Sequence, residues 1–234
     1  TGGAYAVDNG YSDRAFMGLQ GSLYDDTGFG VHVDAVHVQR EEEAAFVAAG
    51  LSYAVTPGTR LKLMAGTSTD NLEIQPELYL NGSATFDLGP QAGLVITPEV
   101  IYRQYRSGTE EVQAQGAISK YFKPFKDGSY IVGTVFGSAT FVQPGDNVGW
   151  EAGANVLHVR PRHMSMGMGL VAGTSAYDNL LGPVPTNVRN DYIGVRPSVS
   201  MYLSPDVEVF ARGEYLWTDF YELAGGFAGI KYAF

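Results

Sequence analysis

Apolar and polar side chains alternate at every second position along most of this chain. Over residues 73–87 one phase is apolar or small and the other is polar or charged, and a similar alternation recurs over 60–67, 192–203 and 207–218. A period of two matches the side-chain repeat of a β-strand that has one face in an apolar environment and the other in a polar one. The pattern therefore predicts an all-β protein.

The connections between these runs alternate in kind. Short turns, such as Thr56-Pro57-Gly58 and Ser204-Pro205-Asp206, alternate along the chain with longer, more polar connections, such as 177–189. Strands are expected at 2–7, 14–24, 28–40, 44–55, 60–67, 73–87, 92–106, 111–122, 129–142, 149–160, 163–177, 190–203, 207–219 and 223–234. This gives about fourteen strands, with twelve as the alternative if two short segments merge or pack inside.

The composition indicates where such strands lie. Only 17% of the residues are charged, whereas soluble domains have roughly 25%. The mean hydropathy is near neutral, and no run of 18 uncharged apolar residues offers a membrane-spanning helix. Strands with one face in lipid and one in an enclosed polar interior satisfy both facts. We therefore expect residues 1–234 to form a single transmembrane antiparallel β-barrel of the bacterial outer membrane, with short periplasmic turns and longer extracellular loops.

The last predicted strand carries a further indication. Ile230, Tyr232 and the terminal Phe234 share one phase with Ala228. An aromatic terminal residue is common in outer-membrane barrels, and we expect Ile230, Tyr232 and Phe234 to act as the signal for the barrel assembly machinery. The alternative, a soluble sandwich, would leave this apolar strand as an exposed edge that invites aggregation, whereas closure onto the first strand removes the edge.

Charge and cysteine content exclude several classes of site. The net charge is −10 without a polybasic run, so no nucleic-acid partner is expected. Cysteine is absent, which removes disulfides and thiolate chemistry. The chain opens at Thr1 without a signal-peptide pattern, so we expect a mature or truncated end, and the barrel could be the C-terminal part of a longer precursor.

Charged and aromatic residues in the polar phase are expected to line the barrel interior. Ionisable groups enclosed in a membrane barrel should pair or contact water. They either form salt bridges that stiffen the wall and close the pore, or they line a hydrated passage in which tyrosine rings stack on sugars. The predicted lumen-lining residues are Arg60, Lys62, Glu73, Glu77, Tyr79, Glu99, Arg103, Tyr105, Glu151, Tyr192, Arg196, Tyr202, Glu208, Arg212 and Glu214.

Three segments depart from simple alternation. Ala35 and Val36 place two apolar residues in succession, and Lys120 falls in an apolar phase, so β-bulges are expected at both places. Over residues 164–176 the polar phase is nearly all glycine and serine, which suggests that a bulky group lies against this wall from inside. Aromatic residues near strand ends, which are expected to form membrane-interface girdles, are Tyr5, Tyr11, Tyr24, Tyr53, Trp150, Tyr177, Trp217 and Tyr221.

Catalytic and metal-binding patterns are weak. The four histidines match no metal-ligand spacing, and His32 and His37 would lie on opposite faces of one strand as isolated polar residues. His158 and Ser165 flank a turn, but His158 belongs to the apolar phase. A catalytic serine would need histidine within hydrogen-bond reach and an orienting carboxylate. No catalytic residue, metal or cofactor is therefore expected.

One stretch of the chain resembles part of a known protein family. Residues 102–122, YRQYRSGTEEVQAQGAISKYF, lead into the turn KPFKDGSY. This stretch resembles the YaiO-type outer-membrane β-barrel family, in which a strand ending in tyrosines and basic residues leads through a short loop into a strand closing on Tyr-Phe. The resemblance implies an export or surface role, in some members linked to surface polysaccharide, and it supplies no catalytic residues.

Three functions follow as expectations. The first is a channel or export conduit for a hydrophilic solute, with polysaccharide favoured. The alternative is a non-conducting receptor or scaffold that acts through its outer loops, chiefly 177–189, and the third is a lipid-modifying enzyme. The expected partners are outer-membrane lipid, the barrel assembly machinery and either a polysaccharide or a small hydrophilic solute.

Overall fold

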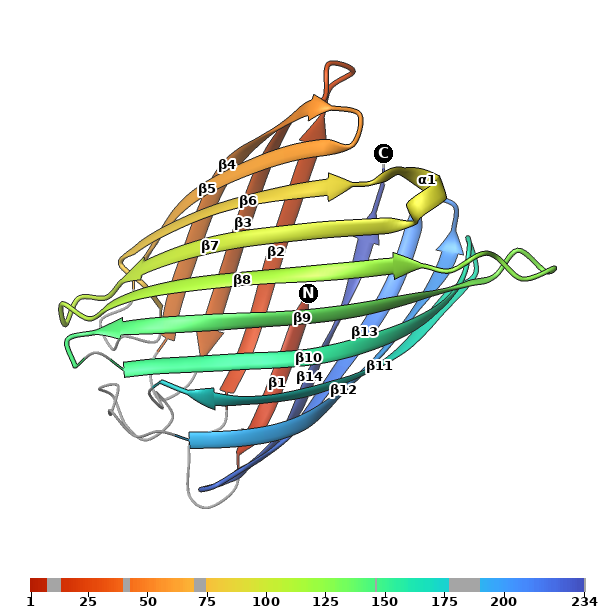
Figure 1. The fold of residues 1–234 in the computed structure, drawn as a ribbon. Helices are drawn as coiled ribbons and strands as arrows, with labels where there is room; N and C mark the ends of the chain where they lie inside the picture. Colours follow the sequence, from red (N-terminus) through yellow and green to blue (C-terminus); the bar gives the residue numbers. More distant parts are fainter. Residues whose placement is uncertain (8–13, 40–42, 70–74, 146, 177–189, 234) are drawn as a thin grey trace.

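The computed structural model describes residues 1–7, 14–39, 43–69, 75–145, 147–176 and 190–233. Fourteen antiparallel strands form one closed barrel in which each strand pairs with its sequence neighbours (Figure 1). The elements are β1 (Gly2–Val7), β2 (Arg14–Tyr24), β3 (Phe29–Gln39), β4 (Glu43–Thr56), β5 (Thr59–Ser68), β6 (Leu78–Asp87), α1 (Gly89–Ala92), β7 (Leu94–Gln104), β8 (Glu110–Tyr121), β9 (Tyr130–Gln143), β10 (Asn147–Arg160), β11 (Met164–Ser175), β12 (Asn190–Ser204), β13 (Val207–Thr218) and β14 (Glu222–Tyr232). The predicted fold class is confirmed, with fourteen strands rather than twelve.

Pairing of the first strand with the last closes the barrel. β1 pairs with β14 from Gly2↔Ala228 to Val7↔Leu223, and its other edge pairs with β2. The amino group of Thr1 donates a hydrogen bond of 2.8 Å to the carbonyl of Gly18 in β2. Six residues of β1 therefore join the two ends of the sheet, as the even strand count requires.

The outer wall of the barrel is apolar. Large hydrophobic side chains in one phase of each long strand are exposed, including Leu19, Leu63 and Ile230, whose exposed fractions are 73%, 69% and 70%. The opposite phase faces the interior and is more buried. Among the described residues, no helix is long and apolar enough to cross a membrane. In lipid the exposed apolar wall is the favourable arrangement, because the closed sheet satisfies its own backbone hydrogen bonds.

The two ends of the barrel differ. Connections of two to eight residues, including the single helical turn α1, lie at the end where β2, β4, β6, β8, β10 and β12 finish. The two longest connections between strands, 69–77 and 176–189, lie at the opposite end. Short turns face the periplasm in outer-membrane barrels and longer loops face outward. The short-turn end, at the upper right of Figure 1, is therefore the periplasmic end.

The strand predicted over 73–87 begins later than expected. β6 starts at Leu78, residues 75–77 form an irregular segment, and 70–74 lie outside the described residues. The hydroxyl of Thr67 donates a 2.7 Å hydrogen bond to the backbone carbonyl of Glu77. The β5–β6 ladder ends at Gly66↔Tyr79. The alternation of apolar and polar residues in the sequence extends past this point, because a loop that leaves a strand can keep the same two-residue pattern.

The two expected bulges are absent from the described pairing, so this prediction is wrong. The registers of β3 run without a break through Ala35 and Val36, and Val36 points inward. β8 is equally regular through Lys120, which remains in the lipid-facing phase. Its ammonium group reaches the carbonyl of Ala92 at the periplasmic end. A long side chain near the membrane edge can thus carry its charge to a polar partner without a change of register.

The expected aromatic girdles are present only in part. Tyr53, Trp150 and Trp217 are exposed on the outer wall. Tyr24, by contrast, contacts the interior residue His32, and Tyr5 shares the interior phase of β1. The phase of the strand, and not nearness to its end, decides which wall an aromatic ring joins. Tyr11 and Tyr177 lie outside the described residues.

Candidate functional site: the polar lumen

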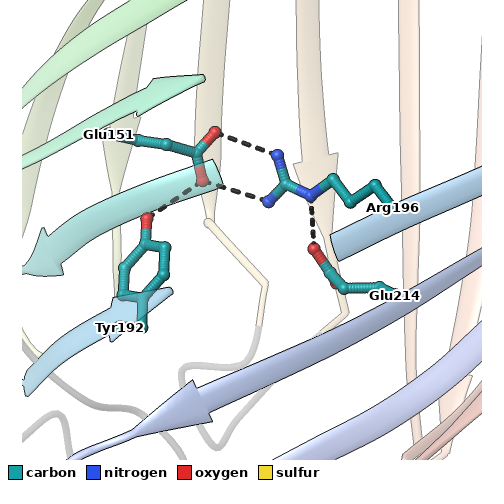
Figure 2. A network of polar contacts seen from close by, with 4 residues as sticks. All are labelled: Glu151, Tyr192, Arg196 and Glu214. Carbon is teal, nitrogen blue, oxygen red and sulfur yellow. Dashed lines mark hydrogen bonds and ion pairs between the residues drawn. The ribbon is translucent and has the colours of Figure 1, made fainter. Parts of the chain in front are cut away.

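An interior network centred on Arg196 joins three strands. The Arg196 side chain on β12 donates to both carboxylate oxygens of Glu151 on β10, over 3.2 and 3.0 Å, and to Glu214 on β13 over 2.6 Å. The hydroxyl of Tyr192 donates to Glu151 over 2.9 Å. Figure 2 shows the guanidinium group held between the two carboxylates. Both acidic groups are thereby compensated inside the barrel.

The glycine-rich phase of β11 makes room for this network. Arg196 is paired with Gly169 in the sheet register, and Tyr192 is paired with Gly173. A Cβ atom at position 173 would lie 2.6 Å from the hydroxyl oxygen of Tyr192 and 2.4 Å from the carbonyl oxygen of Trp150. The expectation of a bulky group against residues 164–176 is confirmed at this point: the tyrosine ring takes the space that a side chain at 173 would occupy.

A second group of polar contacts lies on β6, β7 and β8. Glu99 accepts hydrogen bonds from the side-chain amides of Asn81 and Gln115. Arg103 pairs with the buried Glu111 and also donates to Gln113 over 3.2 Å from each of two guanidinium nitrogens. These residues are contributed by alternate positions of adjacent strands, so the period of two brings them together on one interior face.

A third group lies near the periplasmic end and was not predicted from the sequence. His32 is buried between two serines, at 2.8 Å from the hydroxyl of Ser22 and 2.9 Å from that of Ser52. Arg60 donates to Ser52 over 3.2 Å, and its guanidinium carbon lies 4.8 Å above the Tyr24 ring. His32 is therefore part of a network, and the prediction of an isolated histidine is wrong. The sequence alone does not predict this group, because only the register between strands brings Ser22 and Ser52, which are 30 residues apart, to the two sides of His32.

Three hollows follow one another along the β7–β14 wall. The first, of about 230 Å³, lies nearest the loops and includes Glu111, Thr140 and Tyr192. It shares Ser138 and Glu151 with the second, of about 310 Å³. The second shares Phe136 and Arg196 with the third, of about 390 Å³. The third is lined from seven consecutive strands, β9 through β14 and then β1. Together they form a track from the loop end into the periplasmic half.

Aromatic rings lie against the third hollow. The Tyr5 and Phe16 rings are 6.0 Å apart and stacked, and Phe227 meets Phe16 edge-on at 6.0 Å. The guanidinium carbon of Arg212 lies 5.8 Å above the Phe227 ring. Asn155 also lines this hollow, and its side-chain oxygen is buried without a hydrogen-bond partner within the described ranges. Apolar ring faces and polar groups thus alternate around one cavity.

The predicted site residues fall into three classes. Glu77 is exposed ahead of β6, and the buried Tyr105 follows β7. Ile230 and Tyr232 are exposed on the outer wall, while Glu73 and Phe234 lie outside the described residues. The residues in the interior phase of their strands are Arg60, Lys62, Tyr79, Glu99, Arg103, Glu151, Tyr192, Arg196, Tyr202, Glu208, Arg212 and Glu214.

Not all of these interior residues come together. Tyr202 and Glu208 are paired at the periplasmic mouth, where Glu208 lies 3.8 Å from Lys231. They are therefore remote along the strands from the Arg196 network. Lys62 is opposite Ser52 in the register, which places it beside the His32 group. The lumen thus carries three polar groups, one around Arg196, one around Arg103 and one around His32.

The serine and histidine considered for hydrolysis are not brought together. In the β10–β11 register His158 is opposite Met166, and Ser165 is opposite Val159, so the two side chains point to opposite faces of the wall. The Ser165 hydroxyl instead lies 2.8 Å from that of Ser200. Within the described ranges, no three His, Asp or Glu side chains gather as metal ligands.

Comparisons with known proteins place the fold. No protein-family model matches the chain, and no curated protein matches it in sequence. The solved structure of Omp33 from Acinetobacter baumannii aligns with a TM-score of 0.55 at 12% identity, over 100% of this chain and 95% of that one. The COG4313 outer-membrane channel from Pseudomonas putida F1 aligns with a TM-score of 0.53 at 11% identity, over 98% and 94%. This chain has the fold of an outer-membrane β-barrel.

A third solved structure extends the comparison. A bacterial polysaccharide outer membrane secretin aligns with a TM-score of 0.61 at 7% identity, over 99% of this chain and 85% of that one. The outer-membrane β-barrel described here matches each of these structures over nearly its whole length. Its apolar outer wall locates it in that membrane. The resemblance of residues 102–122 to the YaiO-type family stays a prediction.

Proposed function

We propose that this outer-membrane β-barrel is a passage for hydrophilic solutes, with glycans as the solute class. The proposal rests on the series of three hollows, in which the first and second share Ser138 and Glu151 and the second and third share Phe136 and Arg196. A solute entering at the loops would meet polar groups throughout this track. The track descends along β7–β14 and reaches the periplasmic half at Leu157.

The direction of the charge contacts supports an open passage. Arg196 on β12 binds partners on β10 and β13, and Arg103 on β7 binds Glu111 on β8. Each of these pairs joins strands that are adjacent or one strand apart in the barrel. The side chains therefore lie along the wall, whereas salt bridges that closed the pore would have to span it. This arrangement favours a hydrated passage over the closed alternative.

The lining chemistry supports glycans within the class of hydrophilic solutes. Sugar rings combine an apolar face with a rim of hydroxyls, and proteins contact them with aromatic rings and with groups that donate or accept hydrogen bonds. The third hollow combines the rings of Tyr5, Phe136 and Phe227 with the polar side chains of Arg212 and Glu214. Similarity in fold to a polysaccharide secretin points the same way.

Sugar uptake tests the proposal directly. The purified barrel is reconstituted into liposomes loaded with an impermeant polymer, and swelling is followed in isotonic solutions of neutral sugars of increasing length. We expect swelling with monosaccharides and short oligosaccharides, with rates that fall as length increases. Liposomes holding correctly folded barrel that swell no faster than empty ones would contradict a passage of any kind.

A variant separates the track from the rest of the lumen. Asn155→Leu replaces a polar side chain that lines the third hollow with an apolar one, so oligosaccharide uptake should fall more than monosaccharide uptake. Gln20→Leu, in the interior phase of β2 and outside the lining of the three hollows, is the matched interior control. Equal uptake of all sugars by Asn155→Leu and by the unaltered barrel would remove the glycan preference while leaving the passage standing.

A further inference from the structure

Two neighbouring periplasmic turns carry a concentration of basic residues. The β8–β9 connection holds Lys123 and Lys126, and the β10–β11 turn is flanked by Arg160 and Arg162. All four side chains are exposed. Since β9 pairs with β10, with Tyr130 opposite Val159, the two turns lie side by side. Together with Lys120 near the end of β8, they place five of the chain's 15 lysines and arginines in one sector of the short-turn end.

This sector differs from the other short turns. The β2–β3 turn carries Asp25 and Asp26, the β6–β7 connection follows Asp87, and the β12–β13 turn contains Asp206. The basic sector holds one acid, Asp127. Its carboxylate accepts hydrogen bonds from the hydroxyl and backbone amide of Ser129, over 2.7 and 3.1 Å. These bonds, and then the nearby Arg160, hold the pKa of Asp127 below its usual value, so the group stays ionised and leaves the sector with net positive charge.

The sector also faces lipid. Lys120 and Arg160 belong to the outward phases of β8 and β10, whose other members include the exposed Ile118 and Val156. Phe122 and Phe125 flank Lys123 with exposed fractions of 52% and 54%. The β8–β9 connection is held as a hairpin by backbone bonds from Phe122 to Ile131 and from Phe125 to Ser129. Figure 1 shows it reaching farther out than the neighbouring turns.

We propose that this basic sector, formed by Lys120, Lys123, Lys126, Arg160 and Arg162, binds the anionic headgroups of phospholipids in the periplasmic leaflet. Aromatic side chains at the membrane interface and basic groups just beyond the apolar wall are the pair of features that engage an acyl chain and its headgroup phosphate. A site for an acidic periplasmic protein would need its cations to point out of the barrel end, along the barrel axis. In this sector two of the five cations, Lys120 and Arg160, point toward lipid, which favours a phospholipid headgroup.

Retention of lipid measures this binding. The detergent-solubilised barrel is titrated with phosphatidylglycerol or phosphatidylcholine, and bound lipid is counted by native mass spectrometry. We expect phosphatidylglycerol to be retained preferentially, with a preference that falls as salt rises. The double variant Lys123→Gln/Lys126→Gln should lose affinity by about fivefold per removed charge. The matched control is Arg106→Gln/Lys231→Gln, which removes two cations outside the sector and should retain phosphatidylglycerol.

The outcomes that overturn the proposal are distinct. Equal retention of the two lipids, or equal losses in the two double variants, would show that the sector has no headgroup specificity. Binding of a polyglutamate peptide at the sector without preferential retention of phosphatidylglycerol would assign it to an acidic protein partner instead. Phe122→Ser, which leaves every charge in place, should weaken phosphatidylglycerol retention if the ring contacts the acyl chain.

Discussion

At the scale of single residues, glycines in the interior phase of β11 leave space that larger side chains of the lumen occupy. Gly173 leaves the space that Tyr192 fills, and Tyr192 in turn donates to Glu151. Gly169 lies under Arg196, where a Cβ atom would meet its nearest neighbours at 3.5 Å, an ordinary contact. Two glycines of one strand, in the same phase, therefore differ in what they tolerate.

This difference yields a prediction for β11. Gly173→Ala should destabilise the barrel by about 1–3 kcal/mol, because the added methyl group meets a backbone carbonyl and the tyrosine hydroxyl. Gly169→Ala should have little effect. Urea unfolding in lipid vesicles measures both. Equal stability of the two variants would show that the wall at position 173 relaxes without cost and that the Tyr192 contact does not depend on the glycine.

At the scale of elements, closure depends on the six-residue strand β1. A Cβ atom at Gly3 would lie 2.4 Å from the carbonyl oxygen of Gly226 and 2.5 Å from the Cβ of Phe227. At Gly2 the nearest atom would be 3.7 Å away. The tight approach of Gly3 to β14 is therefore a property of one interior position and not of the whole strand.

Gly3→Val should prevent stable pairing of β1 with β14. The open edges of β2 and β14 would then be free to pair between molecules. We expect loss of heat-modifiable migration in detergent gels, together with aggregation, while Gly2→Val retains the compact form. A heat-modifiable Gly3→Val barrel would mean that closure does not require this close contact.

The β2–β3 turn gives a prediction for pH. The Asp25 carboxylate accepts hydrogen bonds from the Thr27 hydroxyl over 2.7 Å, from the Phe29 amide over 2.9 Å and from the Thr27 amide over 3.0 Å. The Thr27 bond first, then the backbone bonds, lower the pKa of Asp25 in the folded turn. A lowered folded pKa means that this stabilisation is present above the unfolded value, near 3.9, and is lost as pH falls through the folded pKa.

Amide hydrogen exchange checks the turn. At neutral pH, Asp25→Ala should speed exchange at Phe29 relative to the unaltered barrel, after correction for intrinsic rates. The difference should disappear below the folded pKa, where the aspartic acid is neutral. Asp26→Ala, at the neighbouring carboxylate, is the control. If Asp25→Ala and Asp26→Ala had the same effect, the turn would not depend on these three bonds.

Strand phase could be predicted from the sequence, and strand ends and partners could not. Alternation alone located Arg196, Glu151 and Glu214 on interior faces. It did not show that Arg196 reaches across β11, because that contact depends on register between strands far apart in sequence. For the same reason, the contacts of His32 with Ser22 and Ser52 could not be predicted from the sequence. At Lys120 a local reading favoured a bulge, whereas a flexible side chain kept the ladder intact.

At the scale of the whole molecule, the barrel combines an apolar outer wall, a lumen with three polar groups and a basic periplasmic sector. Its ion pairs, within the described residues, lie along the wall and do not span the lumen. The track of hollows from the loop end to the periplasmic half therefore stays open. The passage is a property of this arrangement and of no single residue. It must therefore be tested on the intact barrel in a membrane.

Single-channel recording in planar lipid bilayers tests the passage most directly. An open passage should give stepwise openings from the purified, heat-modifiable barrel. Arg103→Gln, which removes a lumen cation beside Glu111, should move ion preference toward cations. Glu77→Gln, at an exposed carboxylate outside the strands, should change it less. Bilayers that contain the folded barrel and yet stay silent at every applied voltage would show that the lumen is not a passage for ions or solutes.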